Sequence, residues 1–198
     1  MEEIIPKDSR YIPFTQQRSC CVPACISMIM YRRGIPLISQ ELLGYHLGLT
    51  VRRENAKLFW HPRTGKKPPA GWGTQIYKKQ YHPDTAFPKL KIPLKVIYHS
   101  IDSFTDKSFR DFLLESIKKD KDMIVCFDHG NLTGTGKQGG HVCLLDKVYL
   151  QKNEVRIIDP SFVWPKWRIV KISRLKKAME FHGGDRSGGF WEFRKTKK

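Results

Sequence analysis

The spacing of apolar residues limits the fold of this sequence more strongly than any other feature. It is helical near the N-terminus and mainly strand-like in the second half. From Cys21 to Arg33 apolar residues recur every three to four positions, which predicts a helix. A second helix is expected after Ser39, whose hydroxyl can cap its first turn. Beyond residue 94 the apolar residues form mainly strand-length runs, with one helical pattern near residues 104–118. N-terminal helices followed by a mostly antiparallel C-terminal sheet predict an α+β fold.

The predicted strands follow a long stretch of irregular composition. Prolines interleave with glycines and aromatic residues at about 52–95, which predicts an irregular insertion there. Glycines between residues 130 and 140 predict a loop that leads into a strand. A chain of 198 residues can bury one hydrophobic core and is short for two full-sized ones, so we expect residues 1–198 to form a single domain. The expected strands cover residues 94–98, 123–127, 141–149, 154–158 and 190–193.

The charge balance is strongly basic. Lys and Arg total 36 against 19 acidic residues, a formal charge of +17, which attracts anionic partners at modest salt. An acidic protein or a nucleic acid is therefore an expected class of partner, and the scattered basic residues do not choose between them. No apolar run approaches the roughly 18 residues that a membrane span needs. The first ten residues are polar and acidic, unlike a signal peptide, so we expect a cytoplasmic protein with no membrane span.

The cysteines are odd in number and lack the paired spacing of zinc modules or of secreted disulfide scaffolds. We therefore expect reduced thiols, no metal site and no cofactor, although Cys21 and Cys25 share the i, i+4 spacing of a helix. Cys21 differs from the others because it begins the first predicted helix. Unpaired backbone N–H groups and the helix dipole favour a thiolate at that position. The five cysteines lie at positions 20, 21, 25, 126 and 143.

A thiolate nucleophile needs an imidazole within hydrogen-bond reach and a third group that orients the ring. His141 follows a Gly-Gly pair and opens a predicted strand, and Asp159 ends the strand predicted next. Since the ends of adjacent antiparallel strands can lie side by side, both could meet the thiol of Cys21. Gln16 and Gln17 lie just upstream, and either can supply an amide to an oxyanion.

Two alternatives remain open from the residues alone. Cys20 directly precedes Cys21 and could be the reactive thiol in a shifted register. His129 is a second candidate for the imidazole, although it precedes the Gly-rich loop instead of opening a strand.

Three motifs together resemble the papain-like cysteine peptidases that remove double-glycine leaders from bacteriocins, and their soluble stand-alone relatives. The motifs are QQRSCCVPA at 16–24, GGHVCLL at 139–145 and VRIIDP at 155–160. The resemblance implies a papain-like fold in which the thiol helix packs on the sheet. Val22 stands where the family usually has Gly. Carried over residue by residue, the family's roles are oxyanion donor for Gln16, nucleophile for Cys21, general base for His141 and orienting carboxylate for Asp159.

The function expected from this resemblance is a cysteine peptidase that cleaves a peptide or amide bond through an acyl-enzyme. A peptide or protein is then the substrate, and the same residues would also serve an amidase or acyl transferase. The alternative is a catalytically inactive papain-like module that binds nucleic acid or an acidic partner through its basic surface.

Overall fold

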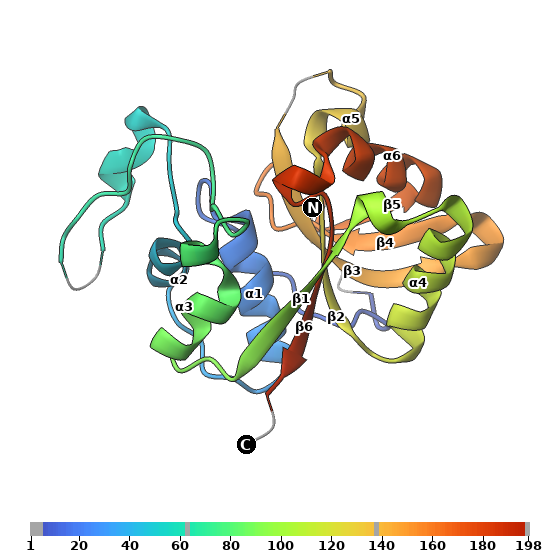
Figure 1. The fold of residues 1–198 in the computed structure, drawn as a ribbon, viewed down its shortest axis with the longest axis horizontal. Coiled ribbons are helices and arrows are strands. Elements are labelled where there is room, and N and C mark those ends of the chain that lie inside the picture. Colours follow the sequence, from blue (N-terminus) through green and yellow to red (C-terminus); the bar gives the residue numbers. More distant parts are fainter. Residues whose placement is uncertain (1–5, 62–63, 137–138, 197–198) are drawn as a thin grey trace.

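A six-stranded antiparallel sheet organises the fold, with the strand order β1-β6-β2-β3-β4-β5 (Figure 1). The computed structural model describes residues 6–61, 64–136 and 139–196. The helices and the antiparallel sheet confirm the predicted α+β class. The strands are β1 Leu94–Ser100, β2 Asp122–Asp128, β3 Gly140–Tyr149, β4 Glu154–Ile158, β5 Trp167–Lys171 and β6 Gly189–Lys195.

Helices cover both faces of this sheet, and Figure 1 shows α1 to α3 on one side and α4 to α6 on the other. Side chains alternate along each strand, so β3 gives Val142 and Leu144 to one core and Cys143 and Leu145 to the other. The helices are α1 Cys21–Arg32, α2 Gln40–His46, α3 Pro83–Lys89, α4 Asp106–Lys118, α5 His129–Thr133 and α6 Ile172–His182.

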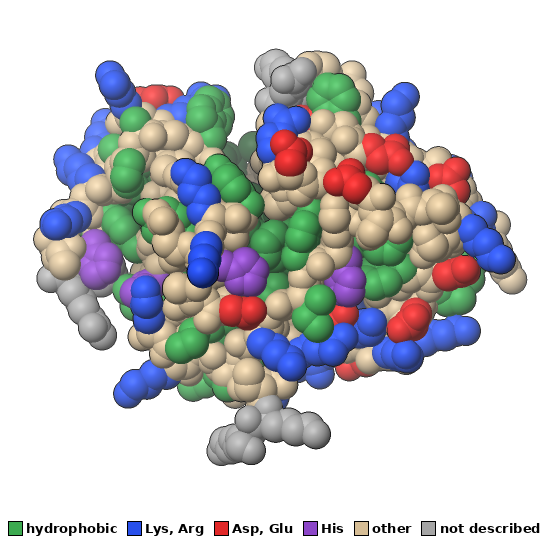
Figure 2. All heavy atoms as spheres, viewed as in Figure 1, with side chains coloured by type: hydrophobic (Ala, Val, Ile, Leu, Met, Phe, Trp, Pro, Cys, Tyr) green, Lys and Arg blue, Asp and Glu red, His purple; other side chains and the backbone are tan. Residues whose placement is uncertain are grey.

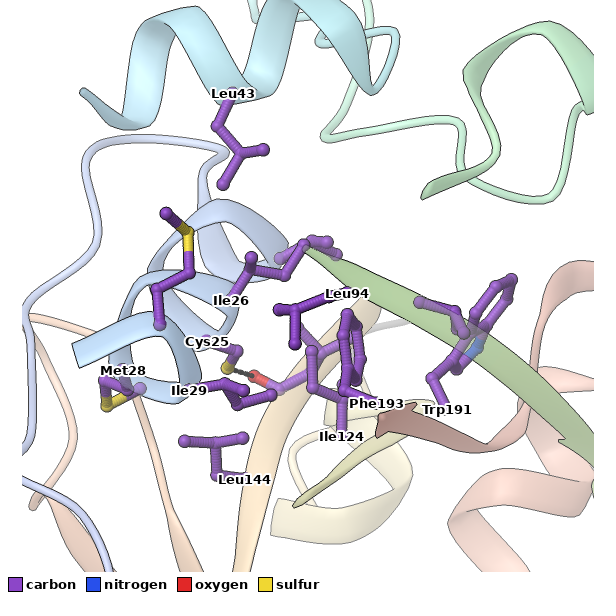
Figure 3. Close-up of a cluster of buried hydrophobic side chains, with 14 of the residues drawn as sticks. Cys25, Ile26, Met28, Ile29, Leu43, Leu94, Ile124, Leu144, Trp191 and Phe193 are labelled. Carbon is purple, nitrogen blue, oxygen red and sulfur yellow. Dashed lines mark hydrogen bonds between the residues drawn. The ribbon is translucent and has the colours of Figure 1, made fainter. Parts of the chain in front are cut away.

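Helix α1 lies in the core that also contains Val142 and Leu144, on the side of the sheet covered by α1 to α3. Its residues from Val22 to Met30 are all buried, as expected for a helix enclosed between the sheet and other helices. Figure 3 shows Ile26 and Ile29 of α1 among side chains from the strands. The thiol of Cys25 lies 3.8 Å from the carbonyl oxygen of Val142 and ties α1 to β3. This packing fixes the position of the first residue of the helix, Cys21.

Several predicted helices agree with the structure because residues at their own ends cap them. Ser39 accepts a hydrogen bond from the backbone N–H of Leu42 and caps α2 as predicted. Thr105 forms a capping box with Ser108 at the start of α4. Gly34, just beyond α1, has a φ of +64°, a conformation that glycine adopts without strain.

Two loop predictions are wrong in part. Residues 130–133 belong to helix α5, because the side chain of Asp128 accepts a hydrogen bond from the N–H of Asn131 and caps that helix. Residues 83–89 form α3, which begins at Pro83, a favourable residue for a first turn. Residues 137–138 of the predicted glycine loop lie outside the described residues.

The rest of the predicted insertion contains short 3₁₀ turns, η1 Arg53–Leu58 and η2 Lys79–Tyr81. Isolated bridges join Thr50 to Gly73 and Val51 to Ala70. In Figure 1 this part of the chain extends away from the sheet on the side of α2.

Within the described part of the chain, no helix combines the length and the apolar character that crossing a bilayer requires. Residues 1–5, which contribute to the signal-peptide argument, lie outside the described residues.

Candidate active site

The two neighbouring cysteines at the start of α1 have different surroundings. Cys20 is fully buried in a small cluster with Leu49, Val51 and Phe59, and burial raises the pKa of its thiol above the ordinary value. Cys21 is partly exposed and lines a cleft. Of these two thiols, the one at the first position of the helix is therefore the one that a ligand can reach.

His141 lies at the start of β3, between the thiol and a carboxylate. Its Nε2 is 2.8 Å from Oδ1 of Asp159, and its ring lines the same cleft as Cys21, whose sulfur is close enough to affect the pKa of the imidazole. Because Nε2 pairs with Asp159, Nδ1 is the ring nitrogen left for Cys21. Burial lowers the pKa of His141, but the hydrogen bonds and charges of Asp159 and Cys21 outweigh burial and raise it to about 9. The imidazole is therefore protonated at neutral pH.

Asp159 is fully buried just after β4, where its carboxylate accepts three hydrogen bonds. Oδ1 accepts from His141 and from the backbone N–H of Ser161 at 2.9 Å, and Oδ2 accepts from Arg168 at 2.7 Å. Burial raises the pKa of this carboxyl, but the bonds and the charge of His141 outweigh burial and hold the pKa well below its usual range. Asp159 is thus a buried anion held between two cations.

Sequence reasoning missed Arg168, which comes from β5. Its side chain stacks over Trp164, with 5.1 Å between the guanidinium carbon and the ring centroid. The sequence offers only a weak signal for Arg168, a basic residue in a short strand-like run. Its contact with Asp159 joins β5 to the residue just after β4, and the sequence does not show that the two strands are neighbours.

His129 is the neighbour of His141. Its ring packs edge-on against the His141 ring at 5.2 Å between centroids, and against Trp164 at 5.4 Å. Burial and the nearby charge of His141 lower the pKa of His129. The structure therefore places His129 as a neutral packing partner of the ring that meets Cys21.

The two glutamines upstream of the thiol also differ. Gln16 lines the same cleft as Cys21, and its Oε1 is buried without a hydrogen-bond partner among the described residues. A buried polar atom without a partner commonly marks a place that water or a ligand completes. Gln17 is exposed and its backbone N–H bonds to Gln40. Gln17 lines a smaller hollow of about 390 Å³ next to the cleft.

The cleft has a volume of about 970 Å³. Its walls come from the segment before α1, the segment from Arg52 to Tyr77, the start of β3 and the region after α6. Figure 2 shows a notch in the molecule between the part that carries the 52–77 segment and the part that carries α5 and α6. A Cβ atom on Gly140 would lie 2.8 Å from Cε1 of His182, so glycine keeps this wall of the cleft open.

A metal could in principle use the same groups, because ligand atoms of His141, Cys143 and Asp159 lie within 4.8 Å of one another. Two of these groups already pair within the protein, since His141 bonds to Asp159 and Arg168 brings a positive charge to the same carboxylate, and burial raises the pKa of the Cys143 thiol. A guanidinium at this distance opposes a second cation.

Comparison with known proteins shows a likeness in structure only. No family model matches the sequence, and no curated protein sequence matches it. The structure is similar to a solved structure from Bacillus anthracis described as a provisionally assigned C39-like peptidase, with a TM-score of 0.59 and 15% sequence identity. The match covers 94% of this chain and 96% of that chain. At this identity the comparison establishes the fold, which is that of a C39-like peptidase.

Proposed function

We propose that the protein is a cysteine peptidase in which Cys21 is the nucleophile, His141 the general acid and base, and Asp159 the group that orients the imidazole. The observation that carries this proposal is the partly exposed thiol of Cys21 in the same cleft as His141, whose ring pairs with the buried carboxylate of Asp159. A thiol, an imidazole and a buried carboxylate in that order are what thiol-dependent acyl transfer requires.

The reaction follows from this arrangement. The Cys21 thiolate attacks the carbonyl carbon of the substrate, and an S–C bond forms. As the C–N bond breaks, protonated His141 gives its proton to the leaving amine. Neutral His141 then takes a proton from water, which attacks the thioester and releases the acyl group.

Two groups are suited to the negative charge that develops on the carbonyl oxygen. One is the backbone N–H of Cys21, at the start of a helix whose first turn has no side-chain cap. The other is the Gln16 amide, which lines the cleft. Val22, where the resembled family usually has Gly, is only 5% exposed and packs in the hydrophobic core, and it also lines the cleft beside Cys21.

The alternative function is binding without turnover, and the net charge of +17 favours it. Figure 2 shows Lys and Arg spread over this face with Asp and Glu among them. A scattered distribution supports general attraction of anions more than one dedicated nucleic-acid surface.

Reaction of Cys21 with iodoacetamide tests the proposal. At pH 6 the wild-type thiol should be alkylated at least about tenfold faster than an ordinary cysteine, because His141 stabilises the thiolate. His141→Ala should remove that advantage, and mass spectrometry of the peptide that contains residue 21 would follow the reaction.

Cys20→Ala is the matched control, since it removes the adjacent buried thiol and should leave the labelling rate at Cys21 unchanged. Labelling at the rate of an ordinary thiol, together with steeply salt-dependent binding of nucleic acid, would reject the peptidase and support the binding module.

A further inference from the structure

The charged side chains of the cleft are mainly cations. Apart from the histidines, three arginines and one glutamate line it: Arg18, Arg52, Arg186 and Glu54. The charges of His141 and Arg168 are balanced by the buried carboxylate of Asp159 and the Cys21 thiolate of the proposed function, so the excess positive charge of the cleft comes from the three arginines. A concave site with charges of mainly one sign focuses its potential on a bound group of the opposite sign.

Arg52 makes the closest contact with an aromatic ring among these three arginines. Its guanidinium carbon lies 3.8 Å from the centroid of the Trp72 ring, a stacked geometry that fixes the plane of the group. Stacking uses the face of the guanidinium and leaves the N–H donors at its edge free to grip a carboxylate with two hydrogen bonds. Glu54 makes an ion pair with Nη1 of Arg52 at 3.6 Å, which is longer than a hydrogen bond and solvent-exposed and is therefore weak.

Arg18 and Arg186 have no carboxylate within ion-pair distance among residues 6–61, 64–136 and 139–196. Arg18 instead lies over the ring of Phe162, at 5.5 Å from the guanidinium carbon to the centroid. Arg186 donates a long hydrogen bond of 3.5 Å to the carbonyl oxygen of Phe181. Both remain able to pair with an anionic group of a ligand in the cleft.

We propose that this cleft selects peptide substrates that carry acidic side chains near the scissile bond, with Arg52 as the main specificity residue and Arg18 and Arg186 as further contacts. The proposal rests on the proposed peptidase function and adds the substrate class to it. Arg52 comes from the 52–77 segment, so this segment provides recognition while α1, β3 and the end of β4 provide the chemistry.

The charge of the cleft can be measured separately from turnover with two alkylating agents of nearly the same shape. Iodoacetate carries a carboxylate and iodoacetamide is neutral, so the ratio of their rates at Cys21 reports the potential next to the sulfur. We expect Arg52→Gln and Arg186→Gln each to lower this ratio about threefold at low salt.

Arg53→Gln is the matched control, because Arg53 is the exposed neighbour of Arg52 and does not line the cleft. It removes the same charge from the whole molecule, so the general field of a basic protein would lower the ratio equally in Arg52→Gln and Arg53→Gln. Equal effects would overturn the proposal.

Turnover of matched peptides then tests the substrate class. Peptides with Glu on either side of the scissile bond should have at least about tenfold higher kcat/KM than the same peptides with Gln, and Arg52→Gln should remove most of that preference. Equal cleavage of both series, with normal reactivity of Cys21, would overturn the inference and leave the peptidase proposal intact.

Two other outcomes would also reject the inference. A Cys21 thiol of ordinary reactivity would remove the peptidase function and this specificity with it. Protection of Cys21 from iodoacetamide by single-stranded RNA, with none from Glu-containing peptides, would assign the cationic cleft to nucleic acid instead.

Discussion

At the scale of single residues, the site depends on the two positive groups that compensate the negative charge of Asp159. This carboxylate is fully buried, and its two oxygens pair with His141 and Arg168. An unpaired charge in such a place would cost several kcal/mol, so the guanidinium makes the buried anion tolerable. The pairing leaves Asp159 charged and lets one oxygen hold the imidazole in a fixed orientation toward Cys21.

The raised pKa of His141 predicts a pH-dependent contribution to stability. Because the pKa of about 9 in the folded protein exceeds the value of about 6.5 in an unfolded chain, protonation favours folding. That contribution, on the order of 3 kcal/mol, is fully present below about pH 6.5 and is lost as the pH rises toward 9.

Urea unfolding of wild type and His141→Gln at a series of pH values measures this effect. The difference in unfolding free energy should shrink between about pH 6.5 and 9. A difference that stays constant over this range would contradict the raised pKa.

At the scale of elements, the side chain of Asp128 joins the start of α5 to the segment that leads into β3. Asp128, at the end of β2, caps α5 with one oxygen and accepts the N–H of Gly139 with the other, at 2.8 Å. Its partner across the sheet is Gly140, the first residue of β3. One carboxylate thus holds both the first turn of α5 and the backbone two residues before His141.

Gly140→Ala tests the need for space at this position. The new Cβ would lie 2.8 Å from the His182 ring, so the ring or the strand must shift. We expect a loss of about 1–2 kcal/mol in unfolding free energy and slower alkylation of Cys21.

His182→Ala in the same chain should restore most of both losses, because the atoms that collide are then removed. If the double variant is as impaired as Gly140→Ala alone, the contact with His182 is not the cause.

Sequence patterns predicted those elements that carry their own local signals. Helices α1 and α2 and the buried strands β2 and β3 have clear periodicity, caps or apolar runs. Strand β5 lies at the edge of the sheet and is only partly buried, so it gives no clear pattern. Helix α6 has apolar residues at helical spacing, but it follows β5 directly without a side-chain cap, so no local signal marks where it begins.

For the site, the motif spacing singled out Cys21, His141 and Asp159, and the structure brings these side chains together. The contact of Arg168 with Asp159 and the wall formed by the 52–77 segment depend on tertiary packing. No spacing along the chain encodes either of them.

At the scale of the whole molecule, the N-terminal segment fastens the two sides of the fold together. Asp122, at the start of β2, is 2% exposed and accepts hydrogen bonds from the hydroxyl of Tyr11 and from Arg32 and Arg33 at the end of α1. Asp8 pairs with Arg156 in β4. The thiol helix is therefore held to the sheet at its far end as well as along its length.

Asp122→Ala should lower the unfolding free energy by about 2–4 kcal/mol, because the buried hydroxyl of Tyr11 and the partly buried guanidinium groups of Arg32 and Arg33 lose their shared acceptor. Asp106→Ala is the control, since the Asp106 side chain is 92% exposed and its ion pair with Lys176 should contribute less than about 1 kcal/mol. Chemical denaturation of both variants gives the comparison, and equal small losses would show that Asp122 does not join the segments.

The 52–77 segment is attached through the bridges Thr50–Gly73 and Val51–Ala70 and through Phe59 beside Cys20, whereas the reacting groups are set in the helix and sheet framework. In the proposed peptidase, such a division would let evolution change substrate selection while Cys21, His141 and Asp159 keep their positions. For the same reason, foreign loops grafted onto this segment should change the substrate preference of the proposed peptidase without displacing its reacting groups.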